Sequence, residues 1–267
     1  MSRSRYYGPD SQVTQPYDYQ PRRRETSVPP GGGARGARPG MRNLLTGAGL
    51  CVAVLLLGEL AKAGPVASLD LRADERIAAH DRTSALTSLA KFATEIGKPE
   101  TVGVGLMILL PVILFLMRRR LDAVKVFCMF GGAYALAEIG KKLINEHRPP
   151  AALQALAADS GGSFPSGHAT AAATLAVALV VIAVTFAGRA TALALGGLYA
   201  VAVACSRFYL GDHYPLDVAG SLLCAVAAAF VVTGLAALPA LQPSLRRLEP
   251  VPARRRAQQR RERRHRA

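Results

Sequence analysis

Apolar residues form six long runs between residues 44 and 238, and polar residues separate them. Each run has about 17–23 residues, near the ~20 that a helix needs to cross a bilayer. The pattern therefore predicts an all-α fold, a polytopic membrane bundle of six transmembrane helices. The third run is the weakest, because Asp122 and Lys125 make its start amphipathic. The expected spans are residues 44–63, 101–117, 123–140, 168–187, 191–208 and 216–238.

Positive charge is concentrated outside these runs. The formal net charge of the chain is +15, and residues 1–43 and 239–267 carry most of it. Lys and Arg favour the cytoplasmic side of a membrane protein. Six spans place both tails, Arg118–Arg120 and Arg189 on one side, so we expect that side and both termini to be cytoplasmic. The segments expected to face outward are 64–100, 141–167 and 209–215.

The two tails differ in composition from the membrane domain at residues 44–238. Residues 1–43 are rich in Pro, Gly and Gln and lack an apolar period, which is typical of disorder. Residues 239–267 form a second basic tail without interleaved aromatic residues. We expect both tails to lie in the cytoplasm and to touch anionic lipid head groups, with no nucleic-acid partner.

The boundaries of the first span raise two smaller points. Ala61-Lys62-Ala63 resembles a signal-peptidase site, but the leader before it is too long, so we expect an uncleaved span. Residues 65–100 mix helical periodicity with charges and predict short helices on the outer surface, with His80 as a surface residue. The cysteines lie singly in apolar runs and are expected to be packing residues.

A first polar block, residues 141–149, follows the third span. If the third helix continues past Gly140, Lys141 and Arg148 lie two turns apart on one face. Two cations on one face suit an anion with several oxygens, which Arg can bind bidentately. The alternative is that both side chains extend to the membrane interface without a ligand.

A second block ends in Pro165-Ser166-Gly167-His168 and runs directly into an apolar helix. Ser166 suits the N-cap, and Gly167 lets a ligand approach the backbone. The free N–H groups and the dipole of a helix N-terminus attract an anion. His168 is placed to give a proton to a leaving oxygen. The alternative is a capped helix start with an interfacial histidine.

A third block, residues 206–217, joins the last two spans. Arg207 closes the fifth helix and His213 opens the sixth. Asp217 follows one helical turn later, so its carboxylate can accept the Nδ1–H of His213 and present Nε2 as a nucleophile. Such a pair seen singly is as often structural. Asp212 is expected to be an exposed turn residue.

Together the blocks place cations, a helix N-terminus and two histidines at one membrane face, the groups that phosphate chemistry needs. The order Lys-x6-Arg-Pro, Pro-Ser-Gly-His and Ser-Arg-x5-His-x3-Asp resembles the three-part signature of the type 2 phosphatidic acid phosphatase superfamily. The signature lies at residues 141–149, 165–168 and 206–217, and the resemblance covers about residues 50–235.

The resemblance implies a membrane-embedded bundle that hydrolyses phosphomonoesters or diphosphates without a metal or another cofactor. It implies that His213, oriented by Asp217, attacks phosphorus to form a phosphohistidine. His168 would protonate the leaving oxygen and then activate water. The residues alone leave open which histidine attacks, although the spacing to Asp217 favours His213. The implied phosphate-binding residues are Lys141, Arg148, Ser166, Gly167 and Arg207.

A site at helix ends is accessible from the lipid leaflet, so we expect an amphiphilic lipid phosphate as substrate, in the plasma membrane with the site on the extracytoplasmic side. A polyprenyl diphosphate is the first choice, followed by phosphatidylglycerophosphate or phosphatidic acid. A lipid-linked phosphotransferase with the same site is an alternative. A vanadate-binding haloperoxidase is a weaker one, since those proteins are soluble, and a binding or transport subunit would need charges within the spans.

Overall fold

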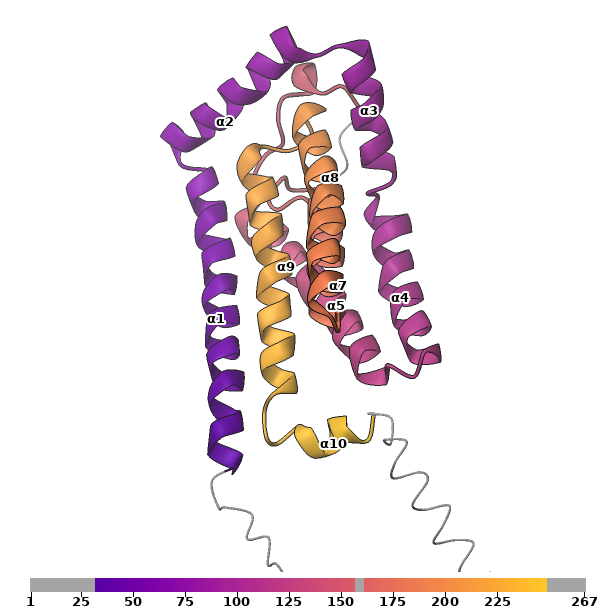
Figure 1. Cartoon of the computed structure of the whole chain (residues 1–267). Coiled ribbons are helices and arrows are strands. Elements are labelled where there is room, and N and C mark those ends of the chain that lie inside the picture. The colour runs from indigo at the N-terminus through magenta and orange to yellow at the C-terminus, as the bar shows by residue number, and fades with distance from the viewer. Residues whose placement is uncertain (1–31, 157–160, 249–267) are drawn as a thin grey trace, which may run out of the picture.

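The computed structural model describes residues 32–156 and 161–248, and every regular element in these ranges is helical (Figure 1). The all-α prediction is confirmed for this part of the chain, while the predicted tail segments 1–31 and 249–267 lie outside it. The helices are α1 (Gly32–Ala61), α2 (Gly64–Arg76), α3 (Ser84–Glu95), α4 (Val104–Leu116), α5 (Arg120–Ile144), α6 (Gly167–Ile182), α7 (Phe186–Thr191), α8 (Gly197–Tyr209), α9 (Pro215–Ala236) and α10 (Gln242–Arg246). Short π-helical turns at Ile77–Asp81, Pro99–Gly103 and Ala192–Gly196 and a 3₁₀ turn at Ala151–Leu153 link some of them.

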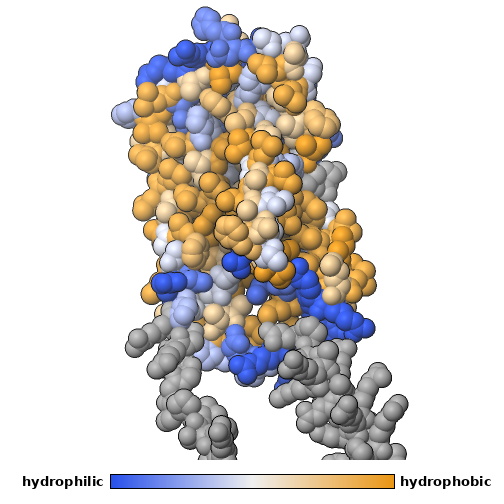
Figure 2. All heavy atoms as spheres, viewed as in Figure 1, coloured by the Kyte–Doolittle hydropathy of each residue, from blue (hydrophilic) through white to orange (hydrophobic). Residues whose placement is uncertain are grey.

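Four helical stretches of the described chain are long and apolar enough to cross a membrane. Two shorter apolar helices, Gly105–Leu116 and Gly167–Ile182, occupy the positions of the second and fourth expected spans. A broad hydrophobic band covers the middle of the molecule in the view of Figure 2, with hydrophilic residues at both ends. The long stretches are Pro39–Ala61, Arg120–Ile144, Phe186–Tyr209 and Pro215–Ala236.

Several helix boundaries differ from the sequence prediction. The fourth expected span, 168–187, ends at Ile182, and the fifth stretch begins at Phe186. Helix α1 begins at Gly32, so residues 32–43, which we assigned to the disordered tail, are helical. Helix α5 begins at Arg120, three residues before the expected span. Asp122 at its start pairs with Arg119 and Lys125. Arg119 lies 2.7 Å from the Asp122 carboxylate, an ion pair that compensates the acid at this helix end. The amphipathic start is therefore compatible with a long helix.

Helices α1 and α9 pack closely through small residues along their length (Figure 1). A Cβ atom at Gly47 would lie 2.9 Å from the Val231 nitrogen, and one at Gly234 would lie 2.8 Å from the Leu44 nitrogen. Such backbone approach is how membrane helices gain contact without a hydrophobic driving force between them. The glycines thus fix α9, which carries two of the predicted site residues at or just before its start, against α1.

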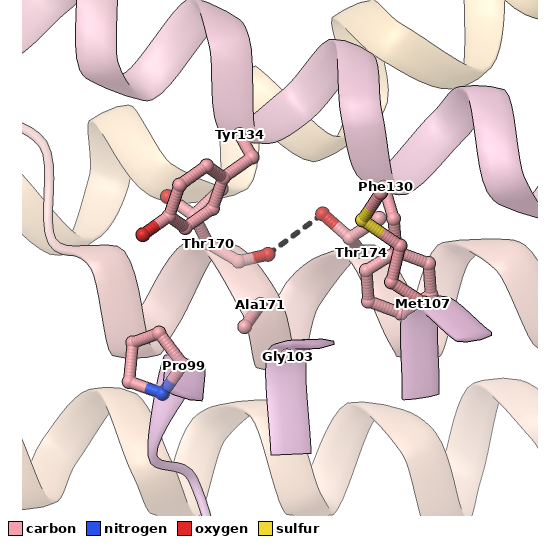
Figure 3. A pocket seen from close by; sticks show the side chains of 8 residues that line it. All are labelled: Pro99, Gly103, Met107, Phe130, Tyr134, Thr170, Ala171 and Thr174. Carbon is pink, nitrogen blue, oxygen red and sulfur yellow. Dashed lines mark hydrogen bonds between the residues drawn. The ribbon is translucent and has the colours of Figure 1, made fainter. Parts of the chain in front are cut away.

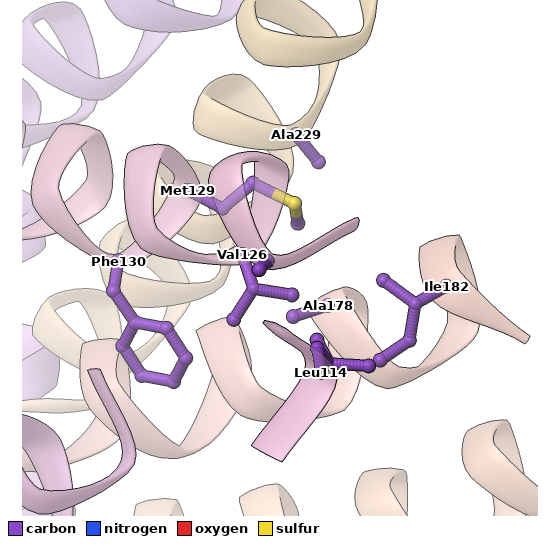
Figure 4. Close-up of a cluster of buried hydrophobic side chains, with 8 residues drawn as sticks. Leu114, Val126, Met129, Phe130, Ala178, Ile182 and Ala229 are labelled. Carbon is purple, nitrogen blue, oxygen red and sulfur yellow. The ribbon is translucent and has the colours of Figure 1, made fainter. Parts of the chain in front are cut away.

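A cluster of buried apolar side chains holds α4, α5, α6 and α9 together (Figure 4). Val126, Met129 and Phe130 recur at helical spacing on one face of α5 and supply the centre of this cluster. Leu114, Ile182 and the small residues Ala123, Ala178 and Ala229 fill the space around them. The cluster makes these four helices a rigid support for the residues at their ends.

The segment between the first two spans is more closely packed than we expected. Helix α2 lies across one end of the bundle, whereas α3 runs beside α8 (Figure 1). Thr94 of α3 and Ser206 of α8 share a buried hydrogen bond of 2.8 Å between their hydroxyls. Arg82, between α2 and α3, donates to the carbonyls of Tyr209 and Leu153. His80 is exposed, as predicted.

Candidate active site

A polar cavity of about 480 Å³ lies where the end of α5 and the start of α6 meet the turn between α8 and α9. All three polar blocks of the sequence contribute to it, although they are far apart in the chain. The predicted site residues that line the cavity are Lys141, Arg148, Gly167, His168 and His213. Ser166, Arg207 and Asp217 are buried next to these residues and support them.

His213 and Asp217 form the pair that the sequence spacing predicted. His213 Nδ1 lies 3.2 Å from Asp217 Oδ2, and both side chains are almost fully buried. Helix α9 begins at Pro215, so His213 precedes the helix and does not open it, but the carboxylate still reaches back to the ring. The Tyr214 N–H donates to the same Oδ2 at 2.9 Å, which fixes the carboxylate at the helix start.

The neighbours of His213 determine which ring nitrogen carries the proton. Arg148 Nη1, which can only donate, lies 3.3 Å from Nε2. A carboxylate can only accept, so Nδ1 must be the protonated nitrogen toward Asp217. Nε2 therefore keeps its lone pair on the side of the ring where Arg148 lines the cavity, which is the tautomer that a nucleophile needs.

Burial also keeps this ring neutral. The loss of solvent lowers the pKa of His213, with Arg148 and Arg207 adding to the effect, while the hydrogen bond to Asp217 opposes it. A lowered pKa means that the imidazole stays uncharged and available at neutral pH. Asp217 then serves to stabilise positive charge when the ring acquires it.

Arg148 reaches the cavity by a route that the sequence did not predict. We placed it on a continuation of the third helix, but α5 ends at Ile144 and Asn145 adopts a left-handed conformation with φ of 48°. The turn reverses the chain and brings Arg148 over the Gly161 and Asp212 carbonyls, to which it donates at 3.2 Å each. The prediction that Lys141 and Arg148 share one helix face is therefore wrong, while the prediction that both lie at one site is correct.

Lys141 lies next to the N-terminus of α6. Its ammonium would be 3.5 Å from a Cβ atom at Gly167, a van der Waals contact that places the cation directly beside the helix start. Ser166 is the N-cap, and its hydroxyl accepts the Ala169 N–H at 3.4 Å. His168, buried in the first turn, lines the same cavity. A cation and a helix N-terminus thus face one space, which favours an anion.

Arg207 and Asp212 form a buried ion pair of 2.9 Å. We expected Asp212 to be an exposed turn residue, and that prediction is wrong, because its side chain is 1% exposed. An arginine in this position needs a counter-charge once it leaves water. The turn before it depends on Gly211, which has φ of +76°, and the backbone carbonyl of Leu153 leaves no room for a Cβ atom there.

A buried aromatic ring positions the second block. Phe164 is fully buried between Gly58 of α1 and Gly220 of α9, where a Cβ atom at Gly58 would lie 2.8 Å from ring carbons. The Ser221 hydroxyl donates to the Ser166 carbonyl at 2.9 Å. These contacts fix the chain directly before α6 to the helices that carry the rest of the site.

Sequence reasoning missed several residues of the site, and three of them carry charge or a hydrogen bond to a predicted residue. Ser163 donates a short hydrogen bond of 2.5 Å to Asp217 Oδ2, and its position in the second block was a usable signal. The Glu138 carboxylate lies 3.2 Å from the Lys141 ammonium. Glu138 precedes Lys141 by one helical turn, so this ion pair could have been predicted from the spacing. Glu100 also lines the cavity, but it lies far away in sequence and carried no signal.

Within the described ranges, no group of three or more His, Cys, Asp or Glu side chains is arranged to hold a metal ion. Lys141, Arg148 and the amide groups at the start of α6 are the groups at this cavity that suit a bound anion. Histidines from the second and third blocks, His168 and His213, line the same cavity as these two cations.

Comparison with known proteins supports the resemblance seen in the sequence. Residues 122–237, which include all three signature blocks, match the family described as the PAP2 superfamily. This part of the chain, which carries the site, is a PAP2-superfamily domain. This confirms the family expected from the lysine, arginine and histidine spacings.

Two relatives define the similarity more closely. The decaprenylphosphoryl-5-phosphoribose phosphatase of Mycobacterium tuberculosis is 43% identical over 89 residues, which are 33% of this chain and 46% of that protein. The chain thus matches about half the length of this relative. The crystal structure of a PAP2-type phosphatidylglycerolphosphate phosphatase from Bacillus subtilis has a TM-score of 0.62 and 25% identity, over 71% of this chain and 94% of the other. The fold is therefore that of a PAP2 transmembrane protein.

Proposed function

We propose that this protein is an integral membrane phosphatase that hydrolyses a lipid phosphate through a phosphohistidine on His213, without a metal. One observation carries the proposal. His213 lies in the neutral tautomer at a cavity that also contains Lys141, Arg148 and the N-terminus of α6. A nucleophile, cations and helix amides around one space are the requirements for transfer of a phosphoryl group.

In the first step, Nε2 of His213 attacks phosphorus while the bond from phosphorus to the lipid oxygen breaks. His168 gives its proton to that leaving oxygen. Asp217 accepts the Nδ1–H and stabilises the positive charge of the ring as the P–N bond forms. Lys141 and Arg148 balance the negative charge on the phosphoryl oxygens.

In the second step, His168 is neutral and takes a proton from water. The oxygen of that water attacks phosphorus, the P–N bond breaks, and its electron pair returns to Nε2 of His213. Inorganic phosphate leaves, and both histidines regain their starting protonation states. The family resemblance implies a phosphate-binding role for Arg207. In this proposal Arg207 also keeps Asp212 and the turn before His213 in place.

A small apolar groove of about 60 Å³ adjoins the cavity and has room for the substrate carbons that lie next to the phosphate (Figure 3). Pro99 and Tyr134 line both the groove and the polar cavity. The Thr170 and Thr174 hydroxyls each donate to a backbone carbonyl one turn earlier, so they present little polarity to the groove. A lipid that lies between α4, α5 and α6 can therefore place its phosphate next to His213.

The acids in the cavity favour a particular class of lipid phosphate. Glu100 and Glu138 would repel a second phosphate but can accept hydrogen bonds from hydroxyl groups. A phosphomonoester on a hydroxylated head group fits this arrangement better than a diphosphate. The names of the two relatives specify such compounds, a phosphoribose lipid and phosphatidylglycerolphosphate. We therefore rank these lipids before the polyprenyl diphosphate that the sequence suggested first.

The distribution of charge supports a plasma-membrane protein with six spans and a cytoplasmic basic end. The start of α1, the Arg118–Arg120 turn and α10 lie at the end of the bundle opposite α2 (Figure 1). Hydrophilic residues gather at that end in Figure 2. Since basic residues favour the cytoplasm, both termini would lie inside and the cavity would open near the outer face.

The first test is phosphate release by the detergent-purified full chain in EDTA. The substrates are a decaprenylphosphoryl phosphoribose, phosphatidylglycerophosphate, phosphatidic acid and a polyprenyl diphosphate. We expect release in EDTA, with the hydroxylated phosphomonoesters cleaved fastest, because no step uses a metal. Loss of activity on chelation that Mg²⁺ restores would contradict the mechanism. A trapped phosphohistidine without phosphate release would instead indicate a phosphotransferase.

A further inference from the structure

We propose that Glu146 is a positioning residue for this reaction, which carries a proton and donates it to Asp217, thereby holding the carboxylate that orients His213. The expected effect of Glu146 on kcat/KM rests on the proposed function. Its expected hydrogen bond to Asp217 rests on the packing of Glu146 alone. Glu146 lies within the spacer between Lys141 and Arg148, at a position that the superfamily signature leaves open.

The contacts of Asp217 leave one of its oxygens without a donor. Oδ2 accepts from the Ser163 hydroxyl, the His213 ring and the Tyr214 N–H. Oδ1 is buried and, among the described residues, receives no N–H and no hydroxyl. Oε2 of Glu146 is buried and unpaired in the same way, although the two carboxyl groups are hydrogen-bond neighbours.

A proton between the two carboxyl groups resolves both deficits. Two ionised carboxylates repel each other and cannot form a hydrogen bond, whereas an acid and a carboxylate can. Asp217 already has three donors that stabilise its negative charge, so the proton belongs on Glu146. The backbone supports this arrangement, because the Ser163 N–H donates to the Glu146 carbonyl at 2.9 Å and keeps the two segments together.

Helix α2 places two further acids against this pair. Asp70 and Asp74 are buried, and the Asp74 oxygens have no hydrogen-bond donor within the described chain. Burial, followed by the charges of Asp70 and Asp217, raises the pKa of Asp74 to about 8. Burial, followed by the charge of Asp217, raises the pKa of Asp70 to about 6. This negative surrounding makes ionisation of a further acid unfavourable.

The pKa of Glu146 is raised to about 9, mainly by burial and then by Asp217 and Asp70, while Lys62 at the end of α1 opposes the shift. The other titratable groups around the cluster are Arg82, which faces Asp74, and Tyr214, which stays neutral because its pKa is raised to about 12. Glu146 is therefore neutral at pH 7. Above about pH 9 it would lose its proton, the hydrogen bond to Asp217 would break, and a second negative charge would lie behind His213.

The test compares kcat/KM across pH for wild type, Glu146→Gln and Glu146→Ala, with Glu75→Gln on the exposed side of α2 as the matched control. The glutamine amide still donates to Asp217 but does not titrate. We expect Glu146→Gln to keep its activity near pH 7 and to lose the fall in activity that wild type shows above about pH 9. Glu146→Ala should lose about tenfold at pH 7, because Asp217 Oδ1 remains without a donor.

An infrared measurement separates this inference from the proposed function. The carbonyl band of a protonated carboxylic acid should be present in wild type at pH 7 and should be weaker in Glu146→Gln, whether or not the protein cleaves any lipid. An unchanged band, or a Glu146→Gln pH profile that coincides with wild type, would overturn the role of Glu146. Absence of hydrolysis with every lipid, together with the expected band difference, would overturn only the proposed function.

Discussion

At the scale of single residues, His213 is the group whose removal has the clearest expected effect. Replacement by alanine removes the nucleophile, and neither Asp217 nor Arg148 can substitute for it. We expect His213→Ala to lower kcat by about 10⁴-fold or more while the protein remains folded in detergent. Phosphate release measures this loss, and His80→Ala at the exposed histidine is the control. Near-normal turnover by His213→Ala would disprove the assignment of the nucleophile.

The Arg207–Asp212 pair has a different expected signature. Asp212→Asn leaves a buried guanidinium without its counter-charge, at a cost of about 3–5 kcal/mol. We expect a lower melting temperature in detergent together with reduced activity, since the pair also holds the turn before His213. Asp122→Asn, at the more exposed pair with Arg119, should cost far less. Equal stability of the two variants would show that the buried pair contributes little.

The site residues were predictable from sequence where local spacing fixes geometry. His213 and Asp217 meet because Asp217 is four positions after His213, and Gly167 and His168 lie at a helix start because Ser166 caps it. Asp212 was not predictable, because a turn residue becomes buried only through the loop that covers it. That loop comes from residues 147–156, whose path over the turn no local pattern indicates.

At the scale of helices, the packing around Phe164 links three segments of the site. A Cβ atom at Gly220 would overlap the Phe164 ring, which has no free space because it also fills the gap at Gly58. We expect Gly220→Ala to cost about 1–3 kcal/mol and to lower activity by displacing the chain before α6. Adding Phe164→Leu to the Gly220→Ala variant should restore part of the stability and part of the activity, as measured by melting temperature and phosphate release.

The control for that prediction is Gly49→Ala in α1, where a Cβ atom would meet nothing within 4 Å. This variant should be neutral or slightly stabilising, because alanine favours a helix over glycine. A similar loss in Gly49→Ala and Gly220→Ala would mean that helix propensity, and not contact with Phe164, determines the result.

The helices were largely predictable, because apolar runs of membrane length have few alternative conformations. Their ends were not. α1 extends to Gly32 through residues with little apolar character, and α5 stops at Asn145, where a left-handed residue reverses the chain. The end of α5 is also held from outside, by the Lys62 ammonium on the Ile144 carbonyl at 3.0 Å. Such contacts join segments that are far apart in sequence.

At the scale of the whole molecule, α2 closes one end of the bundle with acids that the sequence pattern assigned to a surface. Asp70, Asp74 and Glu146 keep their protons to a higher pH in the folded state, with pKa values raised to about 6, 8 and 9, than in the unfolded chain, where they would ionise near their ordinary values of 3.8–4.5. The folded protein therefore binds more protons than the unfolded chain over this range. Its stability should fall as pH rises from about 5 to about 9.

This pH dependence is measurable as the melting temperature of the purified protein in detergent. The lowered pKa of His213 acts in the opposite sense only below about pH 6.5, so the interval from about pH 7 to about pH 9 isolates Asp74 and Glu146. We expect wild type to lose several degrees over that interval and Asp74→Asn to lose less, while Glu75→Gln behaves as wild type. A melting temperature independent of pH in wild type would mean that α2 does not press these acids against Asp217, because acids exposed to water would be ionised in both states.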